Sequence, residues 1–456
     1  MIDTVSLNKS LAEKGFGRRE IGVIGRNLAT LGLLLLVLPI NLLLTGVGLI
    51  SRVSLRNPIS QKTILISGGK MTKALLIARR FHAAGHRVIL IESHKYWLTG
   101  HRFSNAVNKF YTVPAPEKNP SAYIQALLDI IKREKVDLYV PVCSPVASYY
   151  DALVKSEMGF LTQVFHCDPE MVKMLDDKFT FAETARKLGL SVPKSFLITH
   201  PHQVINFDFQ KETRPYILKS IRYDSVRRLD LTKLPCETPE ATERFVRSLP
   251  ISPENPWIMQ EFIPGQEYCT HSTVKNGELR MHCTSKSSAF QVNYENIDHP
   301  RIQSWVSKFV KELGITGQVS FDFIETEDGE VYAIECNPRT HSAITMFYNH
   351  PRVADAYLDE GVWEQPIQPL PDSKPTYWLY HEIWRLTGIR SWKDLQYRWK
   401  VLSTGVDAIY SLDDPLPFLM VHHWQIPLLL WQNLLQLRGW VRIDFNIGKL
   451  VELGGD

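Results

Sequence analysis

The stretch from Gly317 to His341 reads GQVSFDFIETEDGEVYAIECNPRTH and predicts a β-hairpin. Residues 319–324 alternate apolar and polar side chains as a strand does, and Glu327-Asp328-Gly329 has the composition of a tight turn. Residues 331–336 then form a second apolar strand. The sequence therefore places two antiparallel strands in this stretch.

The hairpin carries a candidate metal site. Side chains alternate faces along a strand, so Glu335 and Asn337 point the same way, and Asp322 can face them from the partner strand. Two carboxylates and an amide oxygen form a hard-oxygen site of the kind that Mg²⁺ uses beside bound phosphates, with Mn²⁺ as an alternative. Arg339 follows as a fixed cation for a transferring phosphoryl group. A solvated acidic hairpin is the alternative, but an unpaired Glu335 in an apolar strand would be costly.

The four residues Asp322, Glu335, Asn337 and Arg339 resemble the metal-binding segment of the ATP-grasp superfamily. Members of that family phosphorylate a carboxylate-like oxygen with ATP and then let an amine attack. The resemblance implies an α/β protein whose α+β ATP-grasp core follows a parallel-sheet domain that helps to hold the acceptor. It also implies that Arg339 takes part in catalysis and that ATP and Mg²⁺ are the cofactors.

Two lysines resemble the phosphate-contacting cations of this family. Lys178 opens a predicted helix that ends near Gly189, and Lys219 closes the apolar strand PYILK. The resemblance gives Lys219 a catalytic as well as an ATP-binding role. The chain departs from the family pattern directly afterwards, because the usual Gly-rich flap is replaced by SIRYDSVRR at 220–228. The arginines of that segment either contact phosphate or acceptor, or belong to a solvated basic loop: Arg222, Arg227 and Arg228.

The stretch WIMQEFIPGQEY at 257–268 resembles the family's adenine hinge. A strand runs into an extended linker whose backbone can hydrogen-bond an adenine edge, and Glu261 and Ile263 match that hinge. Glu267 matches the residue that accepts the ribose hydroxyl protons. The motif is weak alone, but it falls in the family's order between Lys219 and the hairpin.

The composition predicts a large soluble enzyme. A chain of 456 residues has room for two or three domains, and its 44% hydrophobic and 22% charged residues are ordinary for a globular protein. A net charge of +4 is too small at this size to indicate a nucleic-acid partner. The six cysteines include no CxxC pair and no zinc spacing, which favours reduced thiols in a cytoplasmic protein.

We expect four segments. Residues 1–61 form an apolar leader, and residues 62–165 form the parallel-sheet domain because short apolar strands alternate with amphipathic helices. Residues 166–350 form the ATP-grasp domain, and residues 351–456 form a Trp-rich C-terminal extension. Ser67-Gly68-Gly69-Lys70 matches no phosphate-loop pattern, so a tight strand–helix turn is preferred there.

The leader favours membrane association. Residues 27–51 contain no charged residue, are long enough to span a bilayer, and have basic residues on both sides. Pro39 permits a kinked, in-plane or re-entrant helix. We therefore expect a cytoplasmic protein that is attached to the cytoplasmic face of a membrane. The alternative is a helix buried against the protein's own apolar surface. Residues 361–456 either pack on this helix or add to the membrane-facing surface.

Three residues are weaker candidates for the acceptor site. His101 and Arg102 follow the second strand, where open α/β sheets bind ligands, and could meet an anionic acceptor; a capped surface turn is the alternative. Lys286 lies in a predicted loop over the active site and could also touch the acceptor, although a surface loop is the default interpretation.

The whole chain resembles the mycosporine-glycine synthetases of UV-protective metabolite biosynthesis. The apolar leader, the segment YWLTGHRFSNAVNKFYTVPAP at 96–116 and the Trp-rich tail carry this resemblance. It implies 4-deoxygadusol as acceptor and glycine as the amine, with mycosporine-glycine, ADP and phosphate as products. The alternative enzyme is a dipeptide or D-alanine-type carboxylate–amine ligase. The alternative that is not an enzyme is a membrane-bound nucleotide-binding scaffold. The sequence leaves the oligomeric state open.

Overall fold

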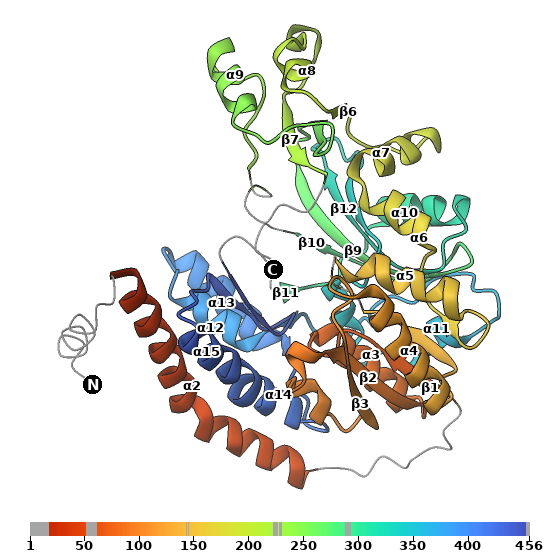
Figure 1. Cartoon of the computed structure of the whole chain (residues 1–456), viewed down its shortest axis with the longest axis vertical. Helices are drawn as coiled ribbons and strands as arrows, with labels where there is room; N and C mark the ends of the chain where they lie inside the picture. Colours follow the sequence, from red (N-terminus) through yellow and green to blue (C-terminus); the bar gives the residue numbers. More distant parts are fainter. Residues whose placement is uncertain are drawn as a thin grey trace.

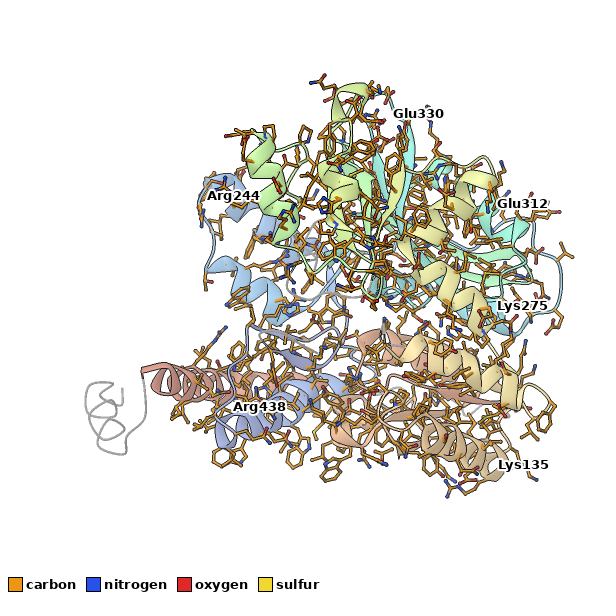
Figure 2. All side chains as sticks on the ribbon, turned by 45° about the horizontal axis from the view of Figure 1, so that its top comes forward. Lys135, Arg244, Lys275, Glu312, Glu330 and Arg438 are labelled. Atoms are coloured by element: carbon orange, nitrogen blue, oxygen red, sulfur yellow. The ribbon has the colours of Figure 1, made fainter. Side chains whose placement is uncertain are left out.

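The computed structural model describes residues 18–51, 62–142, 144, 146–221, 227, 230–287 and 293–452. Their strands form five sheets, of which the two largest are a parallel five-stranded sheet and an antiparallel four-stranded sheet. Figure 1 shows a smaller three-stranded sheet at one end of the molecule and the parallel sheet at the other end. In Figure 2, Arg244 marks the end with the three-stranded sheet and Lys135 marks the end with the parallel sheet. The architecture is mixed α/β, as the sequence predicts.

The parallel sheet lies within residues 62–165 and has the order β3-β2-β1-β4-β5. Its strands are β1 (Thr63–Ile66), β2 (Arg87–Ser93), β3 (Lys109–Val113), β4 (Leu138–Val140) and β5 (Gln163–Val164). Helix α3 (Thr72–Ala83) packs on one face, and α4 (Pro120–Glu134) and α5 (Ala147–Met158) pack on the other. The central strands read as continuous apolar runs because both of their faces are buried.

The three-stranded antiparallel sheet has the order β6-β8-β7. It comprises β6 (Ser195–Ile198), β7 (Tyr216–Ser220) and β8 (Trp257–Glu261), with the short helices α8 (Pro201–Ile205) and α9 (Pro239–Arg247) packed on it. Trp257 and Tyr216 fill its small core. The sheet therefore has a core of its own, which contains none of the predicted site residues.

The four-stranded sheet has the order β10-β9-β12-β13. Its strands are β9 (Gln266–Lys275), β10 (Glu278–Lys286), β12 (Gly317–Glu325) and β13 (Val331–Asn337). One face packs on α10 (Pro300–Glu312) and α7 (Lys178–Lys187), with α6 (Pro169–Asp176) alongside. Aromatic rings close this core, since Trp305 stacks on Phe309 with 5.2 Å between ring centroids and meets Phe321 and Phe323 edge-on. Most of the opposite face packs against residues 342–358, and Asp322 lies on that same face.

The remaining elements come from the two ends of the chain. Helix α2 (Arg18–Ile50) runs through Pro39 without a break and lies along the C-terminal helices (Figure 1). The C-terminal helices are α11 (Asp355–Leu358), α12 (Leu379–Leu386), α13 (Trp392–Thr404), α14 (Leu416–Met420) and α15 (Ile426–Leu435). Short strands complete the region: β14 (Thr376–Tyr377), β15 (Val406–Asp407), β16 (Arg442–Asp444) and β17 (Lys449–Val451). One strand from the middle of the chain, β11 (Asn293–Tyr294), pairs with β14.

The C-terminal extension packs on the parallel-sheet domain as well as on α2. Arg79 of α3 forms an ion pair with Asp414 at 2.8 Å, and Trp378 Nε1 donates to Thr72 Oγ1 at 3.0 Å. Gln425 accepts from the Gly100 N–H at 2.7 Å. The core of the parallel sheet therefore continues into residues 351–452.

Candidate active site

The predicted hairpin is present and contains one feature that the pattern did not indicate. Asp322 lies directly opposite Glu335, but the next pair is Phe323 with Ala333, so Ile334 is an additional residue on β13. In a regular strand Ala333 and Glu335 would share a face, because they are two positions apart. The bulge separates them, so that Ala333 stays in the core while Glu335 joins the half-buried site face.

One cation forms an ion pair with these carboxylates, and two more act on them through their charge. Lys178, the first residue of α7, has its Nζ 3.7 Å from Oε1 of Glu335. Lys219 on β7 donates to Gln260 Oε1 at 3.0 Å, and Arg339 Nη1 lies 3.9 Å from Oδ1 of Asp176. Residues far apart in the chain are thus brought into one electrostatic cluster.

The charges of this cluster shift one another's protonation. Burial and the negative charges of Glu335 and Glu267 raise the pKa of Asp322 to about 8, against the opposing charges of Arg339 and Lys219. Burial would raise the pKa of Glu335 too, but the positive charges of Lys178, Lys219 and Arg339 outweigh it and lower that pKa. Burial lowers the pKa of Lys219, although Glu335 opposes that shift.

The hinge residues lie between the two antiparallel sheets. The Glu261 carboxylate is occupied by the protein, since it accepts from the Lys194 N–H at 3.2 Å and pairs with Arg214 at 3.4 Å. Ile263 is buried, and its N–H has no hydrogen-bond acceptor within the part of the chain that the structure describes. That N–H is available to an acceptor on a ligand.

Glu267 reaches the site face through the sheet register. Glu267 pairs with Ile324, two positions from Asp322 on the same strand, so both carboxylates are on one face. The linker before it is fixed by Gly265, where a Cβ would overlap the carbonyl oxygen of Glu325. Only glycine lets the backbone approach β12 so closely.

The structure buries His101 away from the cluster. Its ring is fully buried beneath α14, its Nδ1 lies 3.0 Å from the Gly69 carbonyl oxygen, and burial lowers its pKa to about 3. The alternative of a capped surface turn was therefore wrong for His101, because its ring lies in the core. The residue is a neutral core histidine because the C-terminal extension covers the turn that carries it.

Arg102 and Lys286 also lie apart from the cluster. Arg102 donates to the Trp97 carbonyl at 2.7 Å and stacks over Phe110, with 4.6 Å from its Cζ to the ring centroid. Lys286 ends β10 instead of lying in a loop, and it pairs with Tyr268, whose side chain packs in the core that faces α10. The register thus places Lys286 on the face opposite Asp322.

The turn from Ser67 to Lys70 is a tight strand–helix turn, as predicted. The Gly69 N–H donates to the Ile91 carbonyl at 2.9 Å, and the Lys70 N–H donates to Glu92 at 2.9 Å. These groups are satisfied within the protein and do not form an open phosphate cradle. Of the arginines in the 220–228 segment, Arg222 and Arg228 lie outside the described residues.

Sequence reasoning missed Lys73 and His341, which belong to a polar group behind Arg339. Lys73, at the start of α3, is buried and donates to the Thr340 carbonyl at 2.6 Å. The His341 N–H donates to His271 Nδ1 at 3.3 Å, and the His341 ring meets Tyr294 edge-on with 5.5 Å between centroids. Burial, together with the charges of Lys73 and Arg339, lowers the pKa of His341 to about 3. The sequence signal was the Thr-His pair that directly follows Arg339.

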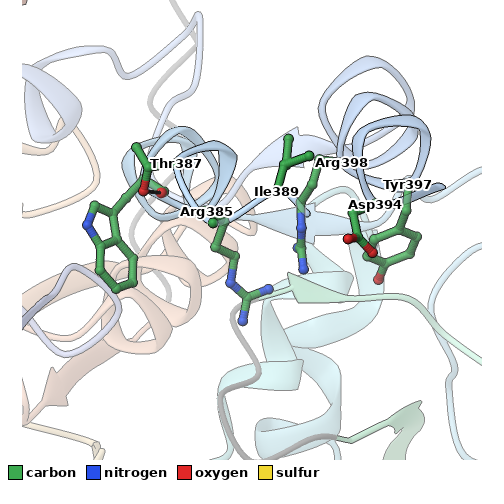
Figure 3. Close-up of a pocket in the computed structure, with 8 residues that line it drawn as sticks. Arg385, Thr387, Ile389, Asp394, Tyr397 and Arg398 are labelled. Carbon is green, nitrogen blue, oxygen red and sulfur yellow. Dashed lines mark hydrogen bonds between the residues drawn. The ribbon is translucent and has the colours of Figure 1, made fainter. Parts of the chain in front are cut away.

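A separate hollow of about 450 Å³ lies between α12 and α13 (Figure 3). Arg385 and Arg398 line it, and both pair with the buried Glu382, at 3.7 and 3.1 Å. None of the predicted site residues contributes to this hollow. Its arginines serve first to neutralise a buried carboxylate.

The middle of the chain is similar to proteins of a known family. Residues 175–343 match the family model described as an ATP-grasp domain. The carbamoyl phosphate synthase large chain of Campylobacter jejuni is 30% identical over 121 residues, which are 26% of this chain and 10% of that protein. The large chain from Methanosarcina acetivorans is 22% identical over 250 residues, 48% of this chain and 22% of that protein. The chain thus spans a small part of these relatives.

Solved structures share the fold. The N5-carboxyaminoimidazole synthetase of Staphylococcus aureus, complexed with ADP, superposes with a TM-score of 0.52 at 14% identity, over 70% of this chain and 82% of that one. The biotin carboxylase domain of the Hydrogenobacter thermophilus 2-oxoglutarate carboxylase, complexed with MgADP and bicarbonate, has a TM-score of 0.51 at 14% identity, over 67% and 71%. The segment that matches the ATP-grasp domain model, residues 175–343, contains Lys178, Lys219, the hinge and the hairpin.

Proposed function

We propose that this protein is an ATP-dependent ligase that phosphorylates an enolate or carboxylate-like oxygen and joins the activated carbon to an amine. The observation that carries the proposal is the convergence of Lys178, Lys219 and Arg339 on the pair Asp322 and Glu335. Such a site has fixed cations for transferring phosphate and oxygen donors for a metal. These are the means by which proteins accelerate phosphoryl transfer.

ATP binds between the two antiparallel sheets in this proposal. The free N–H of Ile263 and the main chain at Glu261 meet the adenine edge, and the Glu267 carboxylate accepts from the ribose hydroxyls. Lys178 and Lys219 hold the phosphates. The carboxylate of Glu261 is already bonded within the protein, and its N–H donates to the Lys194 carbonyl at 2.8 Å, so only the Glu261 carbonyl oxygen is left for the nucleotide.

The donor set fits a divalent cation. Asp322 and Glu335 are opposite one another with mutual repulsion, and Asn337 adds an amide oxygen from the same strand. Their oxygen chemistry suits Mg²⁺, with Mn²⁺ as the alternative. When bound, the metal would neutralise charge on the phosphates, while Arg339 stabilises the charge that develops on the transferring group.

The reaction then has two balanced steps. The acceptor oxygen attacks the γ-phosphorus, so that an O–P bond forms, the bond to the β-phosphate oxygen breaks, and ADP leaves. The amine next adds to the carbon that bears the new phosphate, the C–O bond breaks, inorganic phosphate leaves, and the nitrogen loses one proton. Phosphorylation is needed because hydroxide is a poor leaving group.

The specific substrates are proposed as 4-deoxygadusol and glycine, giving mycosporine-glycine. This choice rests on the resemblance of the leader, the 96–116 segment and the Trp-rich tail to the mycosporine-glycine synthetases. The polar group of Lys73, His341 and Tyr294 supports an acceptor that carries several oxygens, since it is built around Thr340 and His341, the two residues that follow Arg339. His101, Arg102 and Lys286 are not part of the acceptor site in this proposal.

The test is product formation by the purified full-length protein with ATP and Mg²⁺. We expect 4-deoxygadusol and glycine together to release ADP and phosphate in equal amounts with a product of the mass of mycosporine-glycine. Turnover only with ordinary carboxylates and amino acids would support the dipeptide-type ligase instead. ATP binding without turnover in any acceptor–amine pair would point to a nucleotide-binding scaffold.

A further inference from the structure

Helix α2 has polar side chains on its inner face and leucines on its outer face. Asn27, Asn41 and Thr45 are buried against the protein, together with Leu34. The large apolar side chains of the outer face are between 60% and 88% exposed: Leu33, Leu35, Leu36, Ile40, Leu43 and Ile50. A surface helix of a soluble protein has the opposite arrangement, with its apolar stripe turned toward the core.

Polar contacts hold α2 to the C-terminal region along its length. Near its beginning, Arg26 donates to the Trp440 carbonyl at 2.7 Å and stacks over the Trp440 ring. In the middle, Asn41 donates to the Tyr380 hydroxyl at 2.6 Å. Near its end, the Tyr410 hydroxyl donates to the Leu44 carbonyl at 3.3 Å. The helix is therefore docked on the body and does not project from it.

Helix α15 packs beside α2 and extends the apolar surface. Trp424, Trp431 and Leu435 are about half exposed or more, and their spacing of seven and four residues puts them on one side of this helical segment. Tryptophan suits the boundary between lipid and water, since its ring is apolar and its N–H is polar. We call the exposed leucines of α2 together with these three residues the apolar face.

We infer that the apolar face docks on a phospholipid bilayer with α2 lying in the plane of the membrane. An exposed apolar patch of this extent marks a membrane or protein contact. In the sequence, Arg18 and Arg19 precede the apolar stretch and Arg52 and Arg56 follow it, and basic flanks of this kind favour a phospholipid surface. They disfavour a second copy of the chain as the partner, because its flanking sequences carry the same positive charges.

The contacts favour an in-plane helix over a spanning one. By composition, Gly22–Ile50 is the one helix of the described residues that could cross a membrane, with a mean hydropathy of 2.5. To span, it would have to leave the body and carry Asn27 and Asn41 into hydrocarbon without partners, which is costly. The inference does not depend on the proposed ligase activity.

The first experiment is flotation of the full-length protein with vesicles of phosphatidylcholine and phosphatidylglycerol. We expect the wild type to float and the double variant Leu36→Asp, Leu43→Asp to lose binding at least about tenfold, because both charges would enter the lipid boundary. The matched control is Phe160→Asp, Val362→Asp, which places the same charges on exposed apolar residues outside the apolar face. This control should float like the wild type.

Two results would overturn the inference. The first is a wild-type protein that does not bind the vesicles. If that protein is also a dimer in buffer, and Leu36→Asp, Leu43→Asp converts it to a monomer, then the apolar face is a contact between two copies of the chain. The second is a double variant that floats as well as the wild type. Circular dichroism of each variant must match the wild type, so that loss of binding reports the surface and not unfolding.

The second experiment determines whether α2 lies in the plane. Gly22→Cys and Ser51→Cys are made separately in a Cys236→Ser background, and a membrane-impermeant maleimide is added outside sealed vesicles that carry the bound protein. Both ends should be labelled to the same extent with and without detergent. Protection of one end until detergent is added would show that α2 spans, and the in-plane arrangement would be wrong.

Discussion

Asp322 on β12 and Glu335 on β13 lie directly opposite one another. The additional residue Ile334 forms a bulge, so that Glu335 faces the site while Ala333 stays buried in the core. The two carboxylates repel, which contributes to raising the pKa of Asp322 to about 8. Lys178, Lys219 and Arg339 offset part of that repulsion from three other segments. A strand pair that serves only stability would not place two acids in this position, because like charges directly opposite destabilise a sheet.

Replacing Glu335 should separate catalysis from folding. We expect Glu335→Gln to lower kcat/KM by about 10³-fold or more, because a neutral amide is a poor metal ligand. The melting temperature should change little, since the substitution also removes the repulsion with Asp322. The matched control is Glu327→Gln in the exposed hairpin turn, which should leave both quantities unchanged. Wild-type turnover in Glu335→Gln would remove this residue from the site.

Arginine at position 339 should be needed for its shape as well as its charge. Arg339→Lys keeps the positive charge but loses the planar fork that can bond two phosphoryl oxygens. We expect kcat to fall by about 10- to 100-fold while the affinity for ATP stays within about threefold. Steady-state kinetics and equilibrium ATP binding measure the two effects, with the exposed Arg352→Lys as control. Equal kcat values for variant and wild type would contradict the assignment.

The close approach at Gly265 should couple stability to ATP binding. In Gly265→Ala the new Cβ would overlap the carbonyl oxygen of Glu325, so the linker must shift, at a cost of about 1–3 kcal/mol in the free energy of unfolding. We also expect a higher KM for ATP, because the linker joins Ile263 to Glu267. Gly388→Ala, where the nearest atom is 3.6 Å from the new Cβ, is the matched control. Unchanged stability together with unchanged KM would refute the prediction.

A pH-dependent stability effect is expected at Glu134, far from the proposed chemistry. Hydrogen bonds from Lys109, Tyr111 and Arg87 lower the pKa of this carboxyl to about 2 from the ordinary value of 4.5. A carboxyl whose pKa is depressed on folding stabilises the protein above the unfolded pKa, and this contribution is lost as the pH falls from 4.5 toward 2. Glu134→Gln should therefore cost roughly 1–3 kcal/mol at neutral pH.

The difference between Glu134→Gln and the wild type should shrink as the pH is lowered through that window, which denaturant titrations at several pH values measure. The matched control is Asp129→Asn on the exposed side of the same helix. A difference that stays constant between neutral pH and pH 3 would show that the carboxylate charge is not the source of the effect.

The sequence by itself determined the local elements and the chemistry of the hairpin. Strands such as TILIS at 63–67 and the hairpin at 317–341 depend on patterns a few residues long, so periodicity and turn composition predict them. The order of Lys178, Lys219, the hinge and the hairpin was also readable, because each motif is a short contiguous stretch. The match of residues 175–343 to an ATP-grasp domain confirms the superfamily that these motifs indicated.

Only the tertiary structure decided which side chains are covered and what covers them. His101 looked accessible because nothing near it in the sequence shows that α14, more than 300 residues later, buries it. The group of Lys73, His341 and Tyr294 likewise assembles from three distant segments. Helix α2 is the clearest case, since its composition permits a spanning, in-plane or buried helix. The contacts of Asn27 and Asn41 with the C-terminal region orient its leucines outward, and burial of this kind depends on the whole fold rather than on local pattern.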